Sequence, residues 1–552
     1  MSVDSAPTID GTTTDGTTAI DARAYARRWW TLAVLCLSLL IVFVGNSSLN
    51  VTIPTLSREL GASTAQLQWV IASYSLVFAG LLFSTGALGD RFGRKGALQL
   101  GLTVYLVACV LATFSDAMWQ LIACRAVMGI GAAFIMPSTL SILVNVFPPG
   151  ERTKAIAIWA SVTGAAGAIG PVASGWLLGH FWYGSVFLVN VPIVLAALIA
   201  GWFLVPKSKD PEQGQLDPIG ALLSIVGIVS LVYGLIEAPQ LGWGSPSTLI
   251  AIAVAVVALS LFVAWELRVD EPMLDIRFFR NPAFSTGTCG MILIFMSMYG
   301  VMFLITQYFQ LILGYTPLSA ALRLLPMAPI MILVSTMTPR LSARFGVNRV
   351  VSIGMSSVAI GLLMYRFLTP QTPYWYIALA IVPLIGGMAL SMSPMTAAIM
   401  SAVPARRAGA GSAMNDATRE LGGAFGIAMM GSLAASRYAS SLNRVTANLP
   451  AKISRHAEVS LADALAAARK LGGSAGRLLR LGADHAFIDG IHLAVVGGAV
   501  LCAGAAIVVF RKLPHETIHG SALEGPIEAM ETTAALGLAG VEPAFAEISD
   551  AR

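Results

Sequence analysis

Gly86-Ala-Leu-Gly-Asp-Arg-Phe-Gly-Arg-Lys95 decides the fold of this chain, because it places an Asp and three cations between two long apolar runs. The runs on either side, 67–88 and 96–114, are each long enough to cross a hydrocarbon layer about 30 Å thick. Charged side chains are costly in hydrocarbon, so these ten residues must form a tight turn at one water-facing surface.

The composition places the chain among membrane proteins. Of 552 residues, 56% are hydrophobic and only 11% are charged, a balance that a water-soluble globule does not have. The net charge of +5 is scattered through short loops, which argues against a nucleic-acid partner. The five cysteines fall inside apolar runs and predict packing, neither a disulfide framework nor a metal cluster. No GxxxxGK[ST] string occurs, so we expect no nucleotide site, no cofactor and no enzyme.

Fourteen apolar runs follow one another along the chain. Only helices satisfy every backbone polar group in lipid when runs are this long and lack the alternation of barrel strands, so the expected class is an all-α polytopic membrane protein. The first run is too long for a signal peptide and has no convincing cleavage site, so we expect it to be retained. The predicted spans are 30–53, 67–89, 96–114, 117–146, 155–179, 185–205, 216–237, 247–267, 283–313, 318–339, 349–368, 374–402, 408–436 and 485–510.

Lysine and arginine are concentrated in alternate connections, which sets the expected orientation. The opposite short connections carry little beyond Arg58 and Arg366. We therefore expect a multi-pass protein of the cell membrane with both termini cytoplasmic. The long external segment 437–484 is also basic, but long loops escape this bias. The basic connections carry Arg23, Arg27, Arg28, Arg91, Arg94, Lys95, Arg152, Lys154, Lys207, Lys209, Arg268, Arg277, Arg280, Arg340, Arg344, Arg349, Arg406, Arg407, Arg511 and Lys512.

An internal repeat divides the chain into two related halves. Leu88-Gly-Asp-Arg-Phe-Gly93 recurs as Leu341-Ser-Ala-Arg-Phe-Gly346, and Pro149–Lys154 matches Pro404–Gly409 at nearly the same spacing. Parallel halves of this kind bracket a central substrate path in transporters. The predicted units are a disordered cytoplasmic tail (1–28), a six-helix bundle (29–205), two inserted helices with flanking loops (206–281), a second six-helix bundle with the external loop 437–484 (282–510), and a cytoplasmic tail (511–552).

Several motifs resemble signatures of the major facilitator superfamily, in particular its fourteen-helix drug:proton antiporter branch. One departure is Ser174, which stands where the helix 5 signature has glycine. The matching stretches are 86–95 for the loop between helices 2 and 3, Arg125 with Gly129 and Gly131 in helix 4, Gly167-Ala-Ile-Gly-Pro-Val-Ala-Ser-Gly175 in helix 5, and 314–326 for the branch.

The resemblance implies a fold and an activity. The implied fold is the major facilitator fold, two six-helix bundles plus two inserted central helices, giving fourteen transmembrane helices. The implied activity is proton-motive-force-driven efflux of small amphipathic or hydrophobic compounds, such as drugs and dyes, by alternating access. The expected partners are a small-molecule substrate, protons and membrane lipids, and a monomer is assumed.

The residues of the first motif have two interpretations. Its glycines allow a sharp reversal, and Asp90 can cap the following helix and pair with nearby arginines, bonds whose breaking would accompany a change of state. The alternative is a turn whose solvated charges only enforce topology. On the gating hypothesis the residues are Gly86, Gly89, Asp90, Arg91, Gly93, Arg94 and Lys95.

Arg125 and the helix 5 glycines are further candidates. Arg125 lies about 12 Å below the start of its helix, where a charge needs a wet cavity or a partner unless it snorkels to the surface. The resemblance implies that it takes part in proton transfer or polarises the substrate path. In helix 5, close packing and a bend follow from Gly167, Gly170, Pro171 and Gly175, and generic small-residue packing is the competing account.

The proton carrier is harder to place, because the stretch Gly45–Pro54, where the branch usually has an Asp, contains no carboxylate. The candidates are Asp416 and Glu420, one turn apart on a predicted helix, with Arg419 beside them. The equivalent positions of the first half are Ser161 and Ala165. The alternative is a structural ion-pair network with Arg406 and Arg407 at the cytoplasmic end.

Hints about substrate contact are weaker. Trp69, Tyr74, Asn46 and Asn50 are candidate contacts, and several methionines could line an adaptable cavity, although such stripes are more often packing. The apolar spacing of Val459–Leu471 predicts a helix on the outer membrane surface. Two other functions stay open at this point: export or flipping of a lipid or endogenous metabolite, and a receptor or channel on a transporter scaffold.

Overall fold

The computed structural model describes residues 25–208, 217–269, 272–403, 408–446 and 450–514. Regular structure within these ranges is helical throughout. Twelve helical spans in them are long and apolar enough to cross a membrane. They are α2 (Arg28–Glu59), α3 (Thr64–Phe92), α4 (Arg94–Thr113), α5 (Met118–Val146), α7 (Ser185–Leu188) with α8 (Asn190–Leu204), α9 (Pro218–Leu241), α10 (Pro246–Glu266), α11 (Pro282–Gln307) with η2 (Tyr308–Ile312), α12 (Pro317–Leu324) with α13 (Met327–Phe345), α14 (Val347–Met364) with η3 (Tyr365–Phe367), α15 (Tyr374–Ser401) and α19 (Gly473–Lys512).

The two remaining predicted spans, 155–179 and 408–436, also form long helices. They lie in α6 (Pro149–His180) and α16 (Ala408–Thr446), which contain 32 and 39 residues. At about 1.5 Å of rise per residue, both exceed the thickness of the hydrocarbon core. All fourteen predicted apolar runs are therefore helical.

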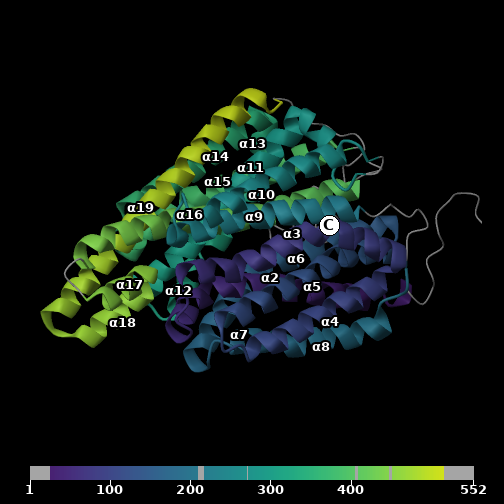
Figure 1. Cartoon of the computed structure of the whole chain (residues 1–552). Coiled ribbons are helices and arrows are strands. Elements are labelled where there is room, and N and C mark those ends of the chain that lie inside the picture. The colour runs from purple at the N-terminus through teal and green to yellow at the C-terminus, as the bar shows by residue number, and fades with distance from the viewer. Residues whose placement is uncertain (1–24, 209–216, 270–271, 404–407, 447–449, 515–552) are drawn as a thin grey trace, which may run out of the picture.

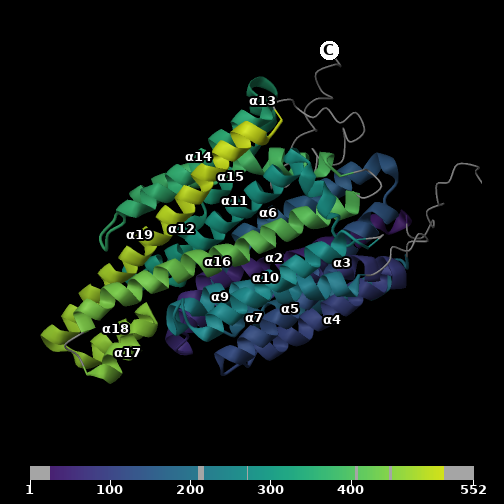
Figure 2. The ribbon, with the colours of Figure 1, turned by 45° about the horizontal axis from the view of Figure 1, so that its top comes forward.

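The helices form two bundles with an inserted pair, as the resemblance implied. The first bundle contains α2 to α8, in which α3 packs on α5 and α2 on α6; the second contains α11 to α19, in which α11 packs on α16 and α14 on α15. Figures 1 and 2 show the purple and blue helices gathered on one side and the green and yellow helices on the other. The inserted helices α9 and α10 pack on each other.

The inserted helix α9 touches both bundles, since it packs against α3 and α16. Trp69 Nε1 of α3 donates to Glu237 Oε1 of α9 at 2.9 Å, and Ser432 of α16 donates to the Leu235 carbonyl. The pair is joined at its other end, where Trp265 Nε1 donates to Asp217 Oδ1 at 2.9 Å. The insertion thus flanks the boundary between the bundles.

The repeated motif forms the same turn twice. Gly93 between α3 and α4 has φ +118°, and Gly346 between α13 and α14 has φ +87°, a region that side chains with a Cβ rarely adopt. The arginine of each copy lies over the following ring, Arg91 over Phe92 at 5.6 Å and Arg344 over Phe345 at 5.3 Å. We call the side of the molecule that carries these turns the α3–α4 end.

The segment 437–484, predicted as an external loop, is largely helical in its described residues. α16 continues to Thr446, α17 (Ala451–Val459) and α18 (Leu461–Leu471) follow, and α19 begins at Gly473. The helix predicted at Val459–Leu471 is present as α18, whose buried residues pack against α19 and α2; its position on the outer membrane surface stays a prediction. The Tyr438 hydroxyl also donates to the carbonyls of Ala457 and Ser460. We call this side of the molecule the α17–α18 end.

The two bundles are joined by neutral contacts toward the α17–α18 end. Gln68 Nε2 of α3 donates to the Ile427 carbonyl of α16 at 2.8 Å, and Gln310 Nε2 of η2 donates to the Val51 carbonyl of α2 at 2.9 Å. α12 packs on α6, whereas α13, the continuation of the same span, packs on α14 and α15. The bundles are therefore closest at the α17–α18 end.

Gly175 of α6 is one of the points of contact, and its substitution tests that closure. A Cβ there would lie 2.8 Å from Leu318 Cα and 3.0 Å from Pro317 O of α12, whereas a Cβ at Gly167 on the same helix meets nothing within 4 Å. We expect Gly175→Ala to lower the free energy of unfolding by about 1–3 kcal/mol through overpacking, and Gly167→Ala to leave it nearly unchanged. Thermal unfolding of the purified variants measures the difference; equal melting temperatures would contradict the close approach.

Candidate functional site

Arg125 of α5 is fully buried, with a relative exposure of 0%. Its Nε donates to the Val70 carbonyl of α3 at 3.1 Å, and one terminal nitrogen donates to Asn46 Oδ1 of α2 at 3.2 Å. The guanidinium carbon lies 4.2 Å from the centre of the Tyr74 ring, a cation–π contact. Three helices of the first bundle therefore converge on one charge, and Arg125 does not snorkel to the surface.

Two residues predicted as substrate contacts belong to this arrangement. Asn46 accepts from the Arg125 guanidinium, and the Tyr74 ring lies against it; the Tyr74 hydroxyl is buried and has no hydrogen-bond partner among the described residues. One turn farther along α2, Asn50 also has a buried amide oxygen without a partner. The first bundle thus presents a cation, a phenol and an unpaired amide oxygen in one region.

The second bundle brings its acids to the same region. Because α16 packs on α3, the Glu420 carboxyl of α16 lies near Ser75 of α3 and within electrostatic range of Arg125. Asp416 and Arg419 lie close enough to Glu420 to interact with it electrostatically. The predicted residues Arg125, Asp416, Arg419 and Glu420 therefore meet across the boundary between the bundles, and we call them the inter-bundle charge site.

Arg419 faces α11 within the second bundle. Its guanidinium carbon lies 5.8 Å from the centre of the Phe295 ring, and its Nε is buried without a hydrogen-bond partner. Tyr299, one turn along α11, interacts electrostatically with both Arg419 and Glu420. The four charged groups of the site are two cations and two carboxyls, so their charges balance when both carboxyls are ionised.

Other predicted substrate contacts lie elsewhere. Trp69 is tied to the inserted helix by its bond to Glu237, away from Arg125. Of the methionines in the predicted stripe, Met291, Met296, Met302 and Met388 are buried, while Met298 and Met392 are half-buried; a role in substrate contact stays a prediction.

The loop motif residues form the turn but their gating role stays a prediction. Gly89 packs closely, since a Cβ there would lie 3.2 Å from the Ala97 side chain, and Lys95 Nζ donates to the Trp202 carbonyl at 2.6 Å. The Arg94 amide donates to the Ser208 carbonyl at 2.9 Å. Asp90 lies in the last turn of α3, and its side chain is outside the described residues.

The helix 5 motif has two packing roles. Gly170 faces α2, where a Cβ would collide with the Ser47 hydroxyl, and the Ser48 hydroxyl donates to the Gly170 carbonyl at 3.1 Å. Gly175 instead faces α12 of the second bundle. One stripe of small residues thus packs α6 within its bundle and also across the boundary, while Pro171 lies inside the helix.

Several residues of the site were not predicted. Phe295 lies against Arg419, and Ser75 and Tyr299 lie within interaction range of Glu420, while Gln68 and Gln310 join the bundles. A signal for the glutamines was present, because an amide side chain within an apolar helix must find a partner. Ser75 and the two rings carry no comparable signal, since serine and aromatic residues are ordinary in such helices.

The chain matches known proteins over most of its length. Residues 35–427 match the family described as the Major Facilitator Superfamily. The multidrug efflux pump LfrA of Mycolicibacterium smegmatis is 35% identical over 88% of this chain and 96% of that protein. The tetracenomycin C resistance and export protein of Streptomyces glaucescens is 32% identical over 88% and 92%, and the methyl viologen resistance protein SmvA of Salmonella typhimurium is 34% identical over 84% and 93%.

Solved structures of transporters share the fold. An inward-facing, unoccupied structure of a bacterial homologue of the human lysosomal transporter Spinster aligns with a TM-score of 0.59 at 16% identity, covering 89% of this chain and 99% of that one. The inward-open xylose transporter XylE from E. coli aligns with a TM-score of 0.54 at 12% identity, covering 90% and 99%. At these identities the likeness concerns the fold alone.

The geometry around Arg125 predicts that lysine cannot replace it. A guanidinium reaches the Val70 carbonyl, Asn46 and the Tyr74 ring together, whereas an ammonium is a point charge with a different reach. We expect Arg125→Lys to lower transport by about tenfold or more, since it loses at least one charge-assisted hydrogen bond. Arg366→Lys, at an exposed arginine outside the site, is the control. Transport in vesicles with matched protein amounts measures the effect. Near-normal transport by Arg125→Lys would contradict the inference that the site requires a guanidinium that bonds several groups at once.

Proposed function

This chain belongs to the major facilitator superfamily, and we propose that it exports small amphipathic or hydrophobic compounds across the cell membrane in exchange for protons. Membership makes it a multi-pass membrane transporter. The observation that carries the proposal is the inter-bundle charge site, in which α16 of the second bundle packs on α3 and places Glu420 within electrostatic range of the buried Arg125. Relatives at 30% identity or more that cover most of the chain include drug resistance and efflux proteins, which supports drug-like substrates.

Alternating access is the transport cycle that we infer. The bundles are closest at the α17–α18 end, and we propose that this end faces outward while the α3–α4 end, with its basic turns, faces the cytoplasm. The described state then has its outer side closed. Transport requires the contacts of Gln68, Gln310 and Gly175 to separate while the opposite end closes.

Proton coupling follows from the charge balance of the site. With both carboxyls ionised, Glu420 offsets part of the charge of Arg125 across the bundle boundary. A proton on Glu420 removes that attraction and leaves the site with excess positive charge, which disfavours the approach of α16 to α3. Proton binding and release therefore bias which end of the molecule is open, and this is the link required for exchange.

The inter-bundle charge site suits the substrates that we propose. The rings of Tyr74 and Tyr299 supply apolar surface. Among the described residues the amide oxygen of Asn50 has no hydrogen-bond partner, and Asp416 adds a carboxyl that lies near Arg419 of the same helix. Mixed aromatic and polar linings bind compounds with an apolar body and a polar group. A cationic substrate competes with a proton for the carboxyls, so export and proton entry occupy the site in turn.

The proposed function predicts efflux that depends on a pH gradient. Proteoliposomes that contain the full chain and an entrapped dye panel should release dye when a proton gradient is applied in the productive direction. An ionophore that collapses the gradient should stop release, and protein-free liposomes are the control. Release of lipid instead of dyes would indicate a lipid exporter, and release unaffected by the ionophore would contradict proton exchange.

The carboxyls of the site predict distinct transport defects. We expect Asp416→Asn and Glu420→Gln each to reduce gradient-driven efflux by about tenfold or more. Glu420→Gln should still exchange substrate for substrate across the membrane without a gradient, because its site keeps one charge state throughout. Asp489→Asn is the control, since Asp489 lies near the α17–α18 end and pairs with Arg437 at 3.9 Å. Full gradient-driven activity in both site variants would exclude them as proton carriers.

A further inference from the structure

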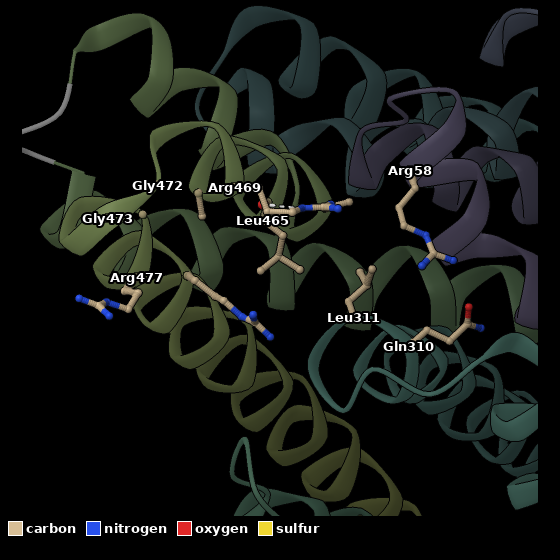
Figure 3. A pocket seen from close by; sticks show the side chains of 12 residues that line it. Arg58, Gln310, Leu311, Leu465, Arg469, Gly472, Gly473 and Arg477 are labelled. Atoms are coloured by element: carbon tan, nitrogen blue, oxygen red, sulfur yellow. Dashed lines mark hydrogen bonds between the residues drawn. The ribbon is translucent and has the colours of Figure 1, made fainter.

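A cavity of about 440 Å³ opens at the α17–α18 end, away from the inter-bundle charge site. Its walls come from α2 of the first bundle and from η2, α18 and α19 of the second (Figure 3). Leu311, Leu465 and Ala468 give it an apolar portion. A cavity of this size accommodates a small ligand, and it lies where both bundles contribute to one wall.

The polar lining of the cavity is strongly basic. Four arginines line it: Arg58, Arg469, Arg477 and Arg480. In the described part of the chain, Arg480 is the member of this set with a carboxylate within ion-pair distance, Asp484 at 3.9 Å. Among the described residues, Arg58 donates to Thr55 Oγ1 at 3.3 Å and Arg469 to the Leu465 carbonyl at 3.3 Å, both of them neutral groups. The cavity therefore carries excess positive charge.

The positive charge of the cavity is concentrated where its walls from the two bundles face each other. Arg58 and Arg469 come from different bundles and lie within electrostatic range of each other, while Glu59, next to Arg58, offsets part of the Arg58 charge. Gly472 and Gly473 line the cavity at the beginning of α19, a helix of 40 residues whose positive dipole end points there. Figure 3 shows Arg469 and Arg58 approaching from opposite sides, with Leu465 and Leu311 below them. A negative group between them would replace repulsion with two attractions.

We propose that this cavity binds an amphiphilic anion, with a phosphate held between Arg58 and Arg469, Arg477 adding positive charge at the wall formed by α19, and an apolar segment lying against Leu311 and Leu465. Guanidinium groups match phosphate oxygens in pairs, and the adjacent apolar surface accounts for the second half of the ligand. The source is either the headgroup of a membrane lipid or a soluble amphiphilic phosphate. This site is separate from the proposed proton-coupled exchange and does not depend on it.

Occupancy has a consequence for the cycle of the protein. Because Arg58 belongs to the first bundle and the other arginines to the second, the bound anion links the bundles at the end where they are closest. The ligand binds the described state more tightly than a state in which these arginines have separated, so its presence stabilises closure of this end.

Native mass spectrometry of the full chain tests the proposal. Protein in neutral detergent is exposed to equal amounts of phosphatidylglycerol and phosphatidylcholine, and the retained lipid is counted. We expect a preference for phosphatidylglycerol of about tenfold, which Arg469→Gln/Arg477→Gln abolishes because charge-assisted bonds are lost. Phosphatidylglycerol should also raise the melting temperature of the unmodified protein more than that of this variant. A further arm adds excess dodecyl phosphate: displacement of the lipid identifies a site for any amphiphilic phosphate, and retention identifies a lipid site.

Matched controls separate the cavity from general surface charge. Arg444→Gln/Lys470→Gln removes the same charge from exposed positions at the same end that do not line the cavity, and we expect it to keep the preference. Arg469→Lys/Arg477→Lys keeps the charge and should retain part of the preference for phosphatidylglycerol. This variant can still test the proposal if the glutamine variant folds poorly. Equal binding of the two lipids by the unmodified protein, or the same loss in the Arg444 and Lys470 control, would overturn the proposal.

Discussion

A guanidinium buried within a membrane span constrains this structure more than any other single group. Placing arginine at the centre of a helix in lipid costs about 3 kcal/mol or more unless it is paired, so the chain must bring polar atoms to Arg125. It does so from α2 and α3, through Asn46 and the Val70 carbonyl. The close approach depends on glycine: a Cβ at Gly129 would lie 2.6 Å from the Tyr74 carbonyl, so α5 and α3 are almost in backbone contact. Gly129 of the helix 4 motif therefore allows the close packing of α5 on α3 that brings hydrogen-bond acceptors to Arg125.

The internal repeat explains the two-bundle arrangement of the helices but not the inter-bundle charge site. Gly93 and Gly346 make equivalent turns, and each bundle is packed by its own small residues. The charges are not repeated, because the positions of the first half that correspond to Asp416 and Glu420 are Ser161 and Ala165. One half supplies the buried cation and the other supplies the acids. The inter-bundle charge site therefore exists only where the two halves face each other, and any movement between the halves changes its electrostatics.

Most of the fold could be predicted from local sequence, and part of the site could. Length and hydrophobicity specify helices in lipid almost without regard to tertiary context, so all fourteen predicted apolar runs are helical. Arg125, Asp416 and Glu420 stand out because charge within an apolar run is rare. Ser75 and Tyr299 do not, since their part in the site comes from which helices become neighbours. Val459–Leu471 shows the same limit: an amphipathic pattern indicates that one face is buried, but not that α19 and α2 supply the residues that cover it.

The hydrogen bonds that join the two bundles are weak enough to break in the transport cycle that we propose. Gln68 and Gln310 make neutral hydrogen bonds to backbone carbonyls, and such bonds between membrane helices contribute about 1 kcal/mol each. Converting a two-state equilibrium from almost all closed to almost all open takes about 5.5 kcal/mol in total. A few neutral bonds and one glycine contact are within reach of that figure, whereas a set of buried ion pairs at the same boundary would not be. In the exchange mechanism that we propose, the strong electrostatic interaction lies at the centre, on groups that would take up a proton. The closing contacts are weak enough for that interaction to decide which end is open.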